Sequence, residues 1–179
     1  AQRFARGHPA LADVSTTPPL AAYLEDWRLT GAGDNEQYVF ELDAAAEDIG
    51  AKLSFRQTIA PVLQGEGGVS KKGPDGASYY YSMPRLQAKG ELLIGDVTIP
   101  VQGLAWFDRE WSTSVLPAEV VGWDWFALQL DDGRSIMVYH LRRSDSQRNA
   151  YDHGMLIDEA AQQVTYLKGG DFELRPVQW

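Results

Sequence analysis

The stretch VTIPVQGLAWFDREW, residues 97–111, alternates apolar and polar side chains along most of its length. One row of this stretch contains Val97, Ile99, Val101, Gly103, Ala105 and Phe107. A repeat of two residues is typical of a β-strand with one buried face. The same alternation occurs in EQYVFEL (36–42), AKLSFRQTI (51–59), RLQAKGELLI (85–94) and WDWFALQL (123–130). The sequence therefore predicts several strands of this kind.

Turn signals separate these stretches. Asp131-Asp132-Gly133 lies between two alternating stretches and predicts a β-hairpin. No amphipathic helix pattern stands out, so we expect an all-β antiparallel barrel of roughly ten strands. The expected domain is a single one over residues 1–179, with residues 1–20 as an irregular lead-in. The glycine-rich stretch LQGEGGVSKKGPDG (63–76) predicts a mobile hairpin loop.

Composition and charge exclude several classes of function. The 179 residues are 44% hydrophobic and carry a net charge of −9, with the lysines and arginines scattered. An acidic chain without a basic face is a poor partner for nucleic acid. No apolar stretch reaches the length of a membrane span, and no signal peptide is visible. The absence of cysteine excludes disulfides, thiolate nucleophiles and cysteine-ligated zinc.

Metal and cofactor motifs are likewise not found in the sequence. The histidines, His8, His140 and His153, are far apart and lack the spacing of zinc ligands. No serine lies in a nucleophile elbow, and the glycine-rich stretch lacks the pattern of a phosphate-binding loop. We therefore expect neither a metal nor a cofactor.

Two charged residues fall on predicted apolar faces. Continuing the row of Phe107 places Arg109 and Trp111 inward, and the row of Phe126 and Leu128 begins with Asp124. Because a buried charge needs a partner, Arg109 and Asp124 are expected to meet. They form either a structural ion pair at the barrel mouth, which the pattern favours, or a polar cluster facing a ligand cavity.

The opposite row offers a different chemistry. Asp108 and Glu110 are two residues apart on one strand face, so their side chains are expected ~7 Å apart. That separation suits an inverting glycosidase, although two acids on an outward face are more often only solvated. Trp106, Trp111, Trp123 and Trp125 are expected to cover one end of the barrel, and buried tryptophan is most often core.

Six segments occur in the order found in a known family. They are RFARGHPALA, LEDWRL, SYYYSMPRL, VQGLAWFDREW, GWDWFALQLDDG and GMLID. The chain resembles the lipocalin-like family of AttH-type proteins and carotenoid 1,2-hydratases (hydroxyneurosporene synthases). The resemblance implies two packed lipocalin-like barrels, with this chain as the first and residues 160–179 leading toward the second. It also implies a location in the cell envelope or periplasm and ABC transporter components as partners.

The resemblance also suggests site residues. Asp108, Glu110 and Trp111 match a frequent Asp-His-Glu-Trp pattern of the family, and Arg109 stands where many members have histidine. The candidates for catalysis are Asp108, Asp124 and Tyr139, and those for ligand contact are Arg109, Glu110, Trp111, Trp123 and Trp125.

The departure at Arg109 bears on the expected function, because arginine does not relay protons at neutral pH. We therefore expect a hydrophobic small molecule (a lipid, isoprenoid or polyene) to be bound. The alternative is a hydro-lyase of the carotenoid 1,2-hydratase type, which adds water to a terminal C=C. Whether the protein is an enzyme stays open, and a glycosidase using Asp108 and Glu110 is the third alternative.

Overall fold

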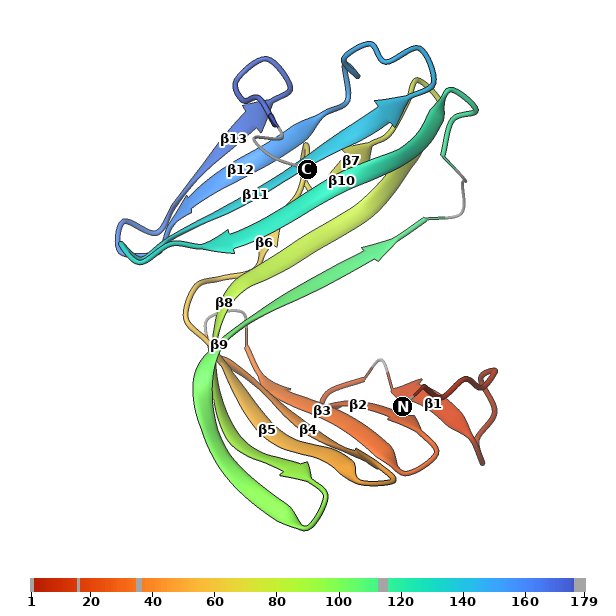
Figure 1. Cartoon of the computed structure of the whole chain (residues 1–179), viewed down its shortest axis with the longest axis vertical. Coiled ribbons are helices and arrows are strands. Elements are labelled where there is room, and N and C mark those ends of the chain that lie inside the picture. Colours follow the sequence, from red (N-terminus) through yellow and green to blue (C-terminus); the bar gives the residue numbers. More distant parts are fainter. Residues whose placement is uncertain (1, 16, 35–36, 113–115, 176–179) are drawn as a thin grey trace. The chain divides into compact units, whose positions relative to one another are not determined.

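Strands make up all of the regular secondary structure in the part of the chain that the computed structural model describes, residues 2–15, 17–34, 37–112 and 116–175 (Figure 1). Their bounds are β1 (Ala12–Ser15), β2 (Leu20–Leu24), β3 (Trp27–Gly33), β4 (Tyr38–Ala46), β5 (Ile49–Gln57), β6 (Val62–Leu63), β7 (Val69–Lys71), β8 (Ala77–Ile94), β9 (Val97–Trp111), β10 (Val120–Gln129), β11 (Arg134–Arg143), β12 (His153–Asp158) and β13 (Gln163–Lys168). The predicted all-β class is confirmed.

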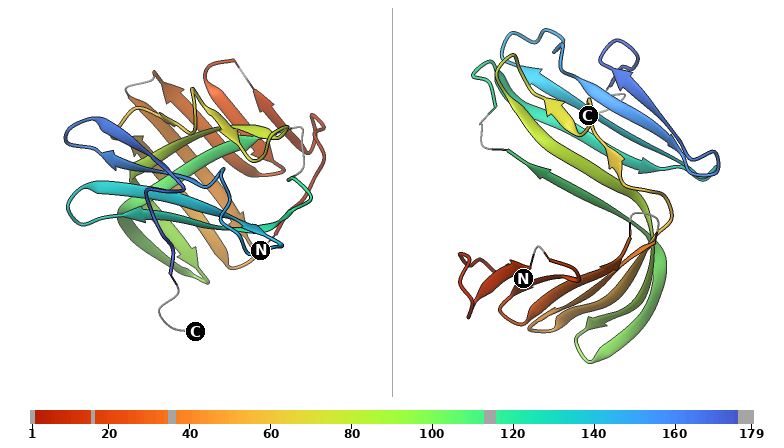
Figure 2. Two further views of the ribbon diagram at one scale, coloured as in Figure 1. Left: turned by 90° about the horizontal axis from the view of Figure 1, so that it is seen from above. Right: turned by 180° about the vertical axis from the view of Figure 1, so that it is seen from behind.

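The strands form two sheets. The first sheet has nine strands: seven follow the order β1-β2-β3-β4-β5-β8-β6, and β7 and β9 are also paired to β8. The remaining strands form a sheet in the order β10-β11-β12-β13, which can also be followed in Figure 2. Within the described residues the first path runs from β1 to β6 without returning to its start. The antiparallel pairing is therefore as expected, but the nine strands form an open sheet and not a closed barrel.

Short turns set the registers of neighbouring strands. Leu130 and Arg134 flank the Asp131–Gly133 turn, and the amide of Leu130 donates to the carbonyl of Arg134 at 2.8 Å. Gly133 has a φ of 86°, a conformation that glycine adopts at little cost. The hairpin predicted at this turn is confirmed by the β10–β11 pairing.

The chain divides into two compact units, each built from two separate stretches. Unit 1 contains Ala1–Ala60 and Arg85–Ala105, and unit 2 contains Pro61–Pro84 and Trp106–Trp179. Strands β8 and β9 contribute residues to both units. The expected lead-in, residues 1–20, contains β1, and the expected tail, residues 160–179, contains β13. Residues 1, 16 and 176–179 of these segments lie outside the described range.

Each unit has its own buried side chains. In unit 1 these include Phe40, Ile59 and Leu86. In unit 2 the most buried apolar side chains lie on β11 and β12, where Met137 and Met155 are paired across the two strands and are fully buried. The buried side chains of β11 and β12 thus form the packed face of the four-stranded sheet.

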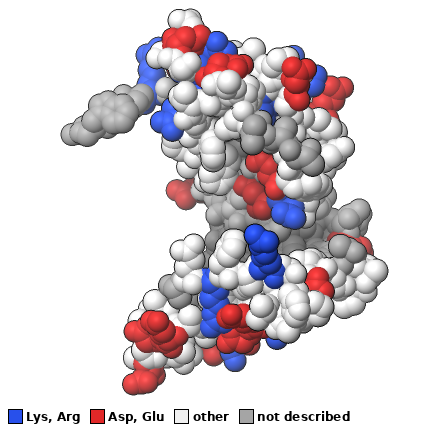
Figure 3. All heavy atoms as spheres, turned by 90° about the vertical axis from the view of Figure 1, so that its right-hand side faces the viewer, with Lys and Arg blue, Asp and Glu red and all other residues white. Residues whose placement is uncertain are grey.

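No helix in the described residues is long and apolar enough to cross a membrane. On the face shown in Figure 3, lysine and arginine side chains are interspersed with aspartate and glutamate. The lysines and arginines, which are scattered along the sequence, are therefore also scattered over this face of the molecule.

Candidate functional site

The inner face of β8 and β9 in unit 2 is polar. Ser78, Tyr80 and Ser82 form a buried row on β8. The Ser82 hydroxyl donates to Asp108 Oδ1 at 2.5 Å, and the Ser78 hydroxyl donates to Glu110 Oε1 at 2.5 Å. Both carboxylates of the WFDREW stretch therefore lie on the buried side of their strand.

The outer face of the same strands is aromatic. Trp111 stacks on Tyr79 with ring centroids 5.6 Å apart, and the Arg109 guanidinium lies 5.6 Å from the centre of the Trp111 ring. Tyr81 contacts Phe107 at 6.3 Å between ring centroids. The sequence predicted the opposite orientation of β9, with Phe107 and Arg109 inward. That prediction is wrong, because the buried row of β8 is Ser-Tyr-Ser and the acids of β9 follow it.

Strand β10 shows the same reversal. Trp123 and Trp125 line a pocket of unit 2, whereas Asp124 lies on the other side of the strand and its Oδ1 is 3.7 Å from Arg142 Nε. The expected Arg109–Asp124 pair is therefore wrong: Asp124 pairs with Arg142, and Arg109 lies over Trp111. The alternative prediction, in which Arg109 and Asp124 form a polar cluster that faces a ligand cavity, is wrong for the same reason.

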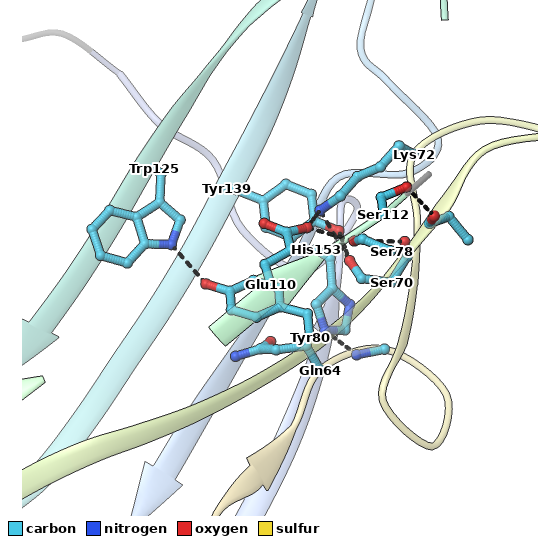
Figure 4. A network of polar contacts seen from close by, with 12 residues as sticks. Gln64, Ser70, Lys72, Ser78, Tyr80, Glu110, Ser112, Trp125, Tyr139 and His153 are labelled. Carbon is cyan, nitrogen blue, oxygen red and sulfur yellow. Dashed lines mark hydrogen bonds and ion pairs between the residues drawn. The ribbon is translucent and has the colours of Figure 1, made fainter. Parts of the chain in front are cut away.

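Lys72, which was not among the site residues predicted from the sequence, lies at the centre of the site. Lys72 Nζ is 3.0 Å from Glu110 Oε1 and donates to Ser70 Oγ at 3.0 Å. It also lies 4.1 Å from the centre of the Tyr139 ring, at cation–π distance. The Ser70 and Tyr139 hydroxyls are 3.0 Å apart. Figure 4 shows these side chains converging from β7, β9 and β11 and the loop after β7.

The pocket beside this network has a volume of about 190 Å³. Its lining residues are Lys72, Tyr80, Glu110, Leu116, Trp123, Trp125, Tyr139 and Leu141. The walls are mainly aromatic and aliphatic, and the charged groups among them are Lys72 and Glu110. A pocket of this kind suits an apolar group with one polar end. We call it the ion-pair pocket.

Tyr80 connects the pocket to the second carboxylate. The Trp125 indole nitrogen donates to the Tyr80 hydroxyl at 3.3 Å. Burial, and then the nearby Asp108 carboxylate, raise the pKa of Tyr80 above its usual range. Asp108 Oδ1 also accepts the Trp106 indole N–H at 2.8 Å. The Tyr80 hydroxyl therefore stays protonated at neutral pH and is available only as a neutral hydrogen-bonding group.

A second pocket, of about 590 Å³, shares Tyr139 and Ser70 with this network. His153 lines it and accepts the amide N–H of Gly65 at 3.3 Å through Nε2. Burial, and then the charge on Lys72, lower the pKa of His153. His153 is therefore held in its neutral form, and protonating it opposes folding.

This shift predicts a pH dependence of stability. The folded pKa of His153 lies below the unfolded value of about 6.5, so its contribution is complete above that pH and is lost as the pH falls below it. We expect the melting temperature to fall more between about pH 7.5 and about pH 5.5 in the wild type than in His153→Gln. The exposed His8→Gln variant is the control and should keep the wild-type profile. Parallel profiles for wild type and His153→Gln would contradict the prediction.

Metal ligands do not gather in the described residues: no group of three or more His, Asp or Glu side chains is arranged to hold an ion. His140 Nδ1 lies 2.7 Å from Asp152 Oδ2, and the other carboxylate oxygen accepts the Leu141 amide at 2.8 Å. This pair fixes a turn against β11.

The structure brings some of the predicted site residues together and leaves others apart. The ion-pair pocket is lined by four of them: Glu110, Trp123, Trp125 and Tyr139. Asp108 does not line the pocket but neighbours Tyr80, which does. Arg109 and Trp111 are on the outer aromatic face, and Asp124 is on the outer side of β10. The roles of these residues stay predictions.

Lys72, Ser70 and Tyr80 were missed for identifiable reasons. Residues 63–76 were taken as a mobile loop, but they contain the strand residues Val69–Lys71 and deliver the buried Ser70. Tyr80 is the middle one of three consecutive tyrosines, so the sequence did not single it out. The signal available in the sequence was the alternate spacing of Ser70 and Lys72, which directs both side chains to one side if the chain stays extended past Lys71.

The sequence matches the family described as AttH-like over residues 1–179. The chain belongs to the AttH-like family. The resemblance noted in the sequence is thereby confirmed. No curated protein matches the sequence.

Two solved structures are similar to this AttH-like chain. A protein of Nitrosomonas europaea that has been assigned as AttH is 33% identical, with a TM-score of 0.78 over 88% of this chain and 48% of that one. Kievitone hydratase from Nectria haematococca is 12% identical, with a TM-score of 0.54 over 88% of this chain and 62% of that one. The second likeness shows the fold alone. This chain spans about half the length of the Nitrosomonas protein.

Proposed function

We propose that unit 2 of this AttH-like chain binds an elongated apolar molecule whose end enters the ion-pair pocket. The observation that carries the proposal is the composition of that pocket. Trp123, Trp125 and Leu141 provide apolar walls around one lysine–glutamate pair. Binding sites of this type use apolar walls for affinity and a few polar groups for orientation.

The size of the pocket limits what it encloses. Clefts that hold a whole drug-sized ligand measure roughly 300–1,000 Å³. The ion-pair pocket, at about 190 Å³, is smaller and holds only a terminal segment. Trp123, with 59% of its surface exposed, offers a contact for the part of the molecule that extends outside.

A hydro-lyase is the second candidate. The fold likeness to kievitone hydratase and the inward position of Asp108 and Glu110 favour it. Hydrating an alkene requires a group that gives a proton to carbon. Glu110 accepts from Lys72 and Ser78, and Asp108 accepts from Ser82 and Trp106, so neither is arranged as a donor. The binding function is therefore preferred.

The other expectations remain predictions. Asp108 and Glu110 are engaged by different protein groups, which gives no support to a glycosidase. We retain as proposals the cell-envelope location, the ABC transporter partners and a second lipocalin-like domain in the same protein.

The test uses an acyclic carotenoid with unsaturated prenyl ends, titrated into the protein while tryptophan fluorescence is followed. We expect saturable quenching, and Trp125→Ala should weaken binding by about tenfold because the residue is a pocket wall. Phe126→Ala is a matched control. Phe126 is the next residue and has the same exposed fraction, 42%, but does not line the pocket.

Mass spectrometry of the recovered carotenoid separates the two candidates. Unchanged carotenoid supports binding, and a mass gain of one water supports the hydro-lyase. An equal loss of affinity in Trp125→Ala and Phe126→Ala, or no saturable quenching, would reject the ion-pair pocket as the binding site. Native mass spectrometry and lipid extraction of the purified protein identify molecules carried from the cell.

A further inference from the structure

We infer that the ion-pair pocket selects a hydroxyl group at the end of its apolar ligand, in preference to a carboxylate, ketone or ether. The inference rests on the proposed function and names the ligand class: apolar alcohols. It follows from which hydrogen-bonding atoms around the pocket are already engaged and which are open.

The open atom is an acceptor. Lys72 Nζ and the Ser78 hydroxyl both contact Oε1 of Glu110, at 3.0 Å and 2.5 Å. Among the described residues no hydrogen bond to Oε2 of Glu110 is found. The Glu110 side chain is 39% exposed and lines the pocket. A carboxylate oxygen only accepts hydrogen bonds, so the group that pairs with Oε2 must bring a hydrogen.

Two of the donors around the pocket, the Lys72 ammonium and the Trp125 indole, are engaged. The Lys72 ammonium has three hydrogens, and its neighbours are Glu110, Ser70 and the face of the Tyr139 ring. The Trp125 indole N–H is directed to Tyr80. A ligand that offers only acceptor atoms therefore competes with contacts that these two groups already make.

The charges of Glu110 and Lys72 also favour a hydroxyl group on the ligand. A ligand carboxylate would lie beside the Glu110 carboxylate, and like charges at short range repel. A ligand ammonium would lie near the Lys72 ammonium, which already neutralises Glu110. A hydroxyl is neutral and can donate to Glu110 Oε2. It is the group that fits both the hydrogen bonding and the charge.

The test uses farnesol, farnesyl methyl ether and farnesoic acid, which share one carbon skeleton and differ at the polar end. Tryptophan quenching at about pH 7.5 gives their affinities for the wild-type protein. We expect farnesol to bind about tenfold more tightly than either of the others, because a site built around a hydroxyl rejects analogues that leave its polar atom unpaired.

Glu110→Gln tests the residue responsible. The amide removes the negative charge and supplies N–H donors, so farnesoic acid should gain affinity and the preference for farnesol should fall to about threefold or less. Glu66→Gln, an exposed glutamate that does not line the ion-pair pocket, is the control and should retain the wild-type preference.

The outcomes distinguish the two proposals. Equal binding of the three compounds, or tightest binding of the acid or the ether, overturns the selection of a hydroxyl and leaves the proposed function standing. Binding of none of them overturns both. If Glu110→Gln fails to fold, the ranking of the three compounds by the wild-type protein decides the inference.

Discussion

Met137→Ala is expected to lower the free energy of unfolding by about 3 kcal/mol, as is typical for truncating a large buried side chain. Met137 is fully buried and lies on β11, between Ala127 of β10 and Met155 of β12. Removing its side chain takes away buried apolar contacts and leaves a cavity that neighbouring strands cannot fill. Urea unfolding followed by tryptophan fluorescence gives the change.

Leu128→Ala is the control for this substitution. Leu128 belongs to the same sheet and is similar in size, but 47% of its surface is exposed. We expect a cost below about 1 kcal/mol, because little apolar surface returns to water. A similar loss in both variants would contradict the described core of unit 2.

Lys72→Met is expected to cost about 2 kcal/mol. Breaking a buried ion pair costs roughly 3–5 kcal/mol, since the remaining charge has no partner. Here Lys72 is 15% exposed and Glu110 is 39% exposed, so water recovers part of that loss. The hydrogen bond that Lys72 donates to Ser70 is lost as well. The measurement is again urea unfolding.

Two further variants show whether the ion pair is the cause. Lys71→Met changes the exposed neighbour by the same substitution and should alter stability by less than about 0.5 kcal/mol. Adding Glu110→Leu to Lys72→Met removes the unpaired carboxylate and should restore part of the loss. Equal effects of Lys71→Met and Lys72→Met would show that the Lys72 contacts contribute nothing to folding.

Alternation in the sequence predicted the strands well but not their orientation. The stretches of β4, β5, β8, β9 and β10 were found from their period of two, and the Asp131–Gly133 hairpin from its turn residues. Orientation was inferred by placing apolar rows inward. In β9 that rule failed, because hydrogen bonds to Ser78 and Ser82 place Glu110 and Asp108 inward.

The site was predictable in part. Glu110, Trp123, Trp125 and Tyr139 were named from the sequence and lie around one pocket. Lys72 was not, since its role depends on Glu110, which is distant along the chain, and on the pairing of β7 with β8. The alternate spacing of Ser70 and Lys72 is a local signal for their orientation, but the long-range contact with Glu110 leaves none in a single sequence.

The continuity of β8 and β9 through both units has a consequence for dissecting the molecule. Each unit consists of two stretches that interleave along the chain. Trimming from either terminus therefore cannot isolate one unit intact. A fragment containing only the pocket would need its two stretches joined by a new linker across the excised residues 85–105, so functional studies should keep the chain whole.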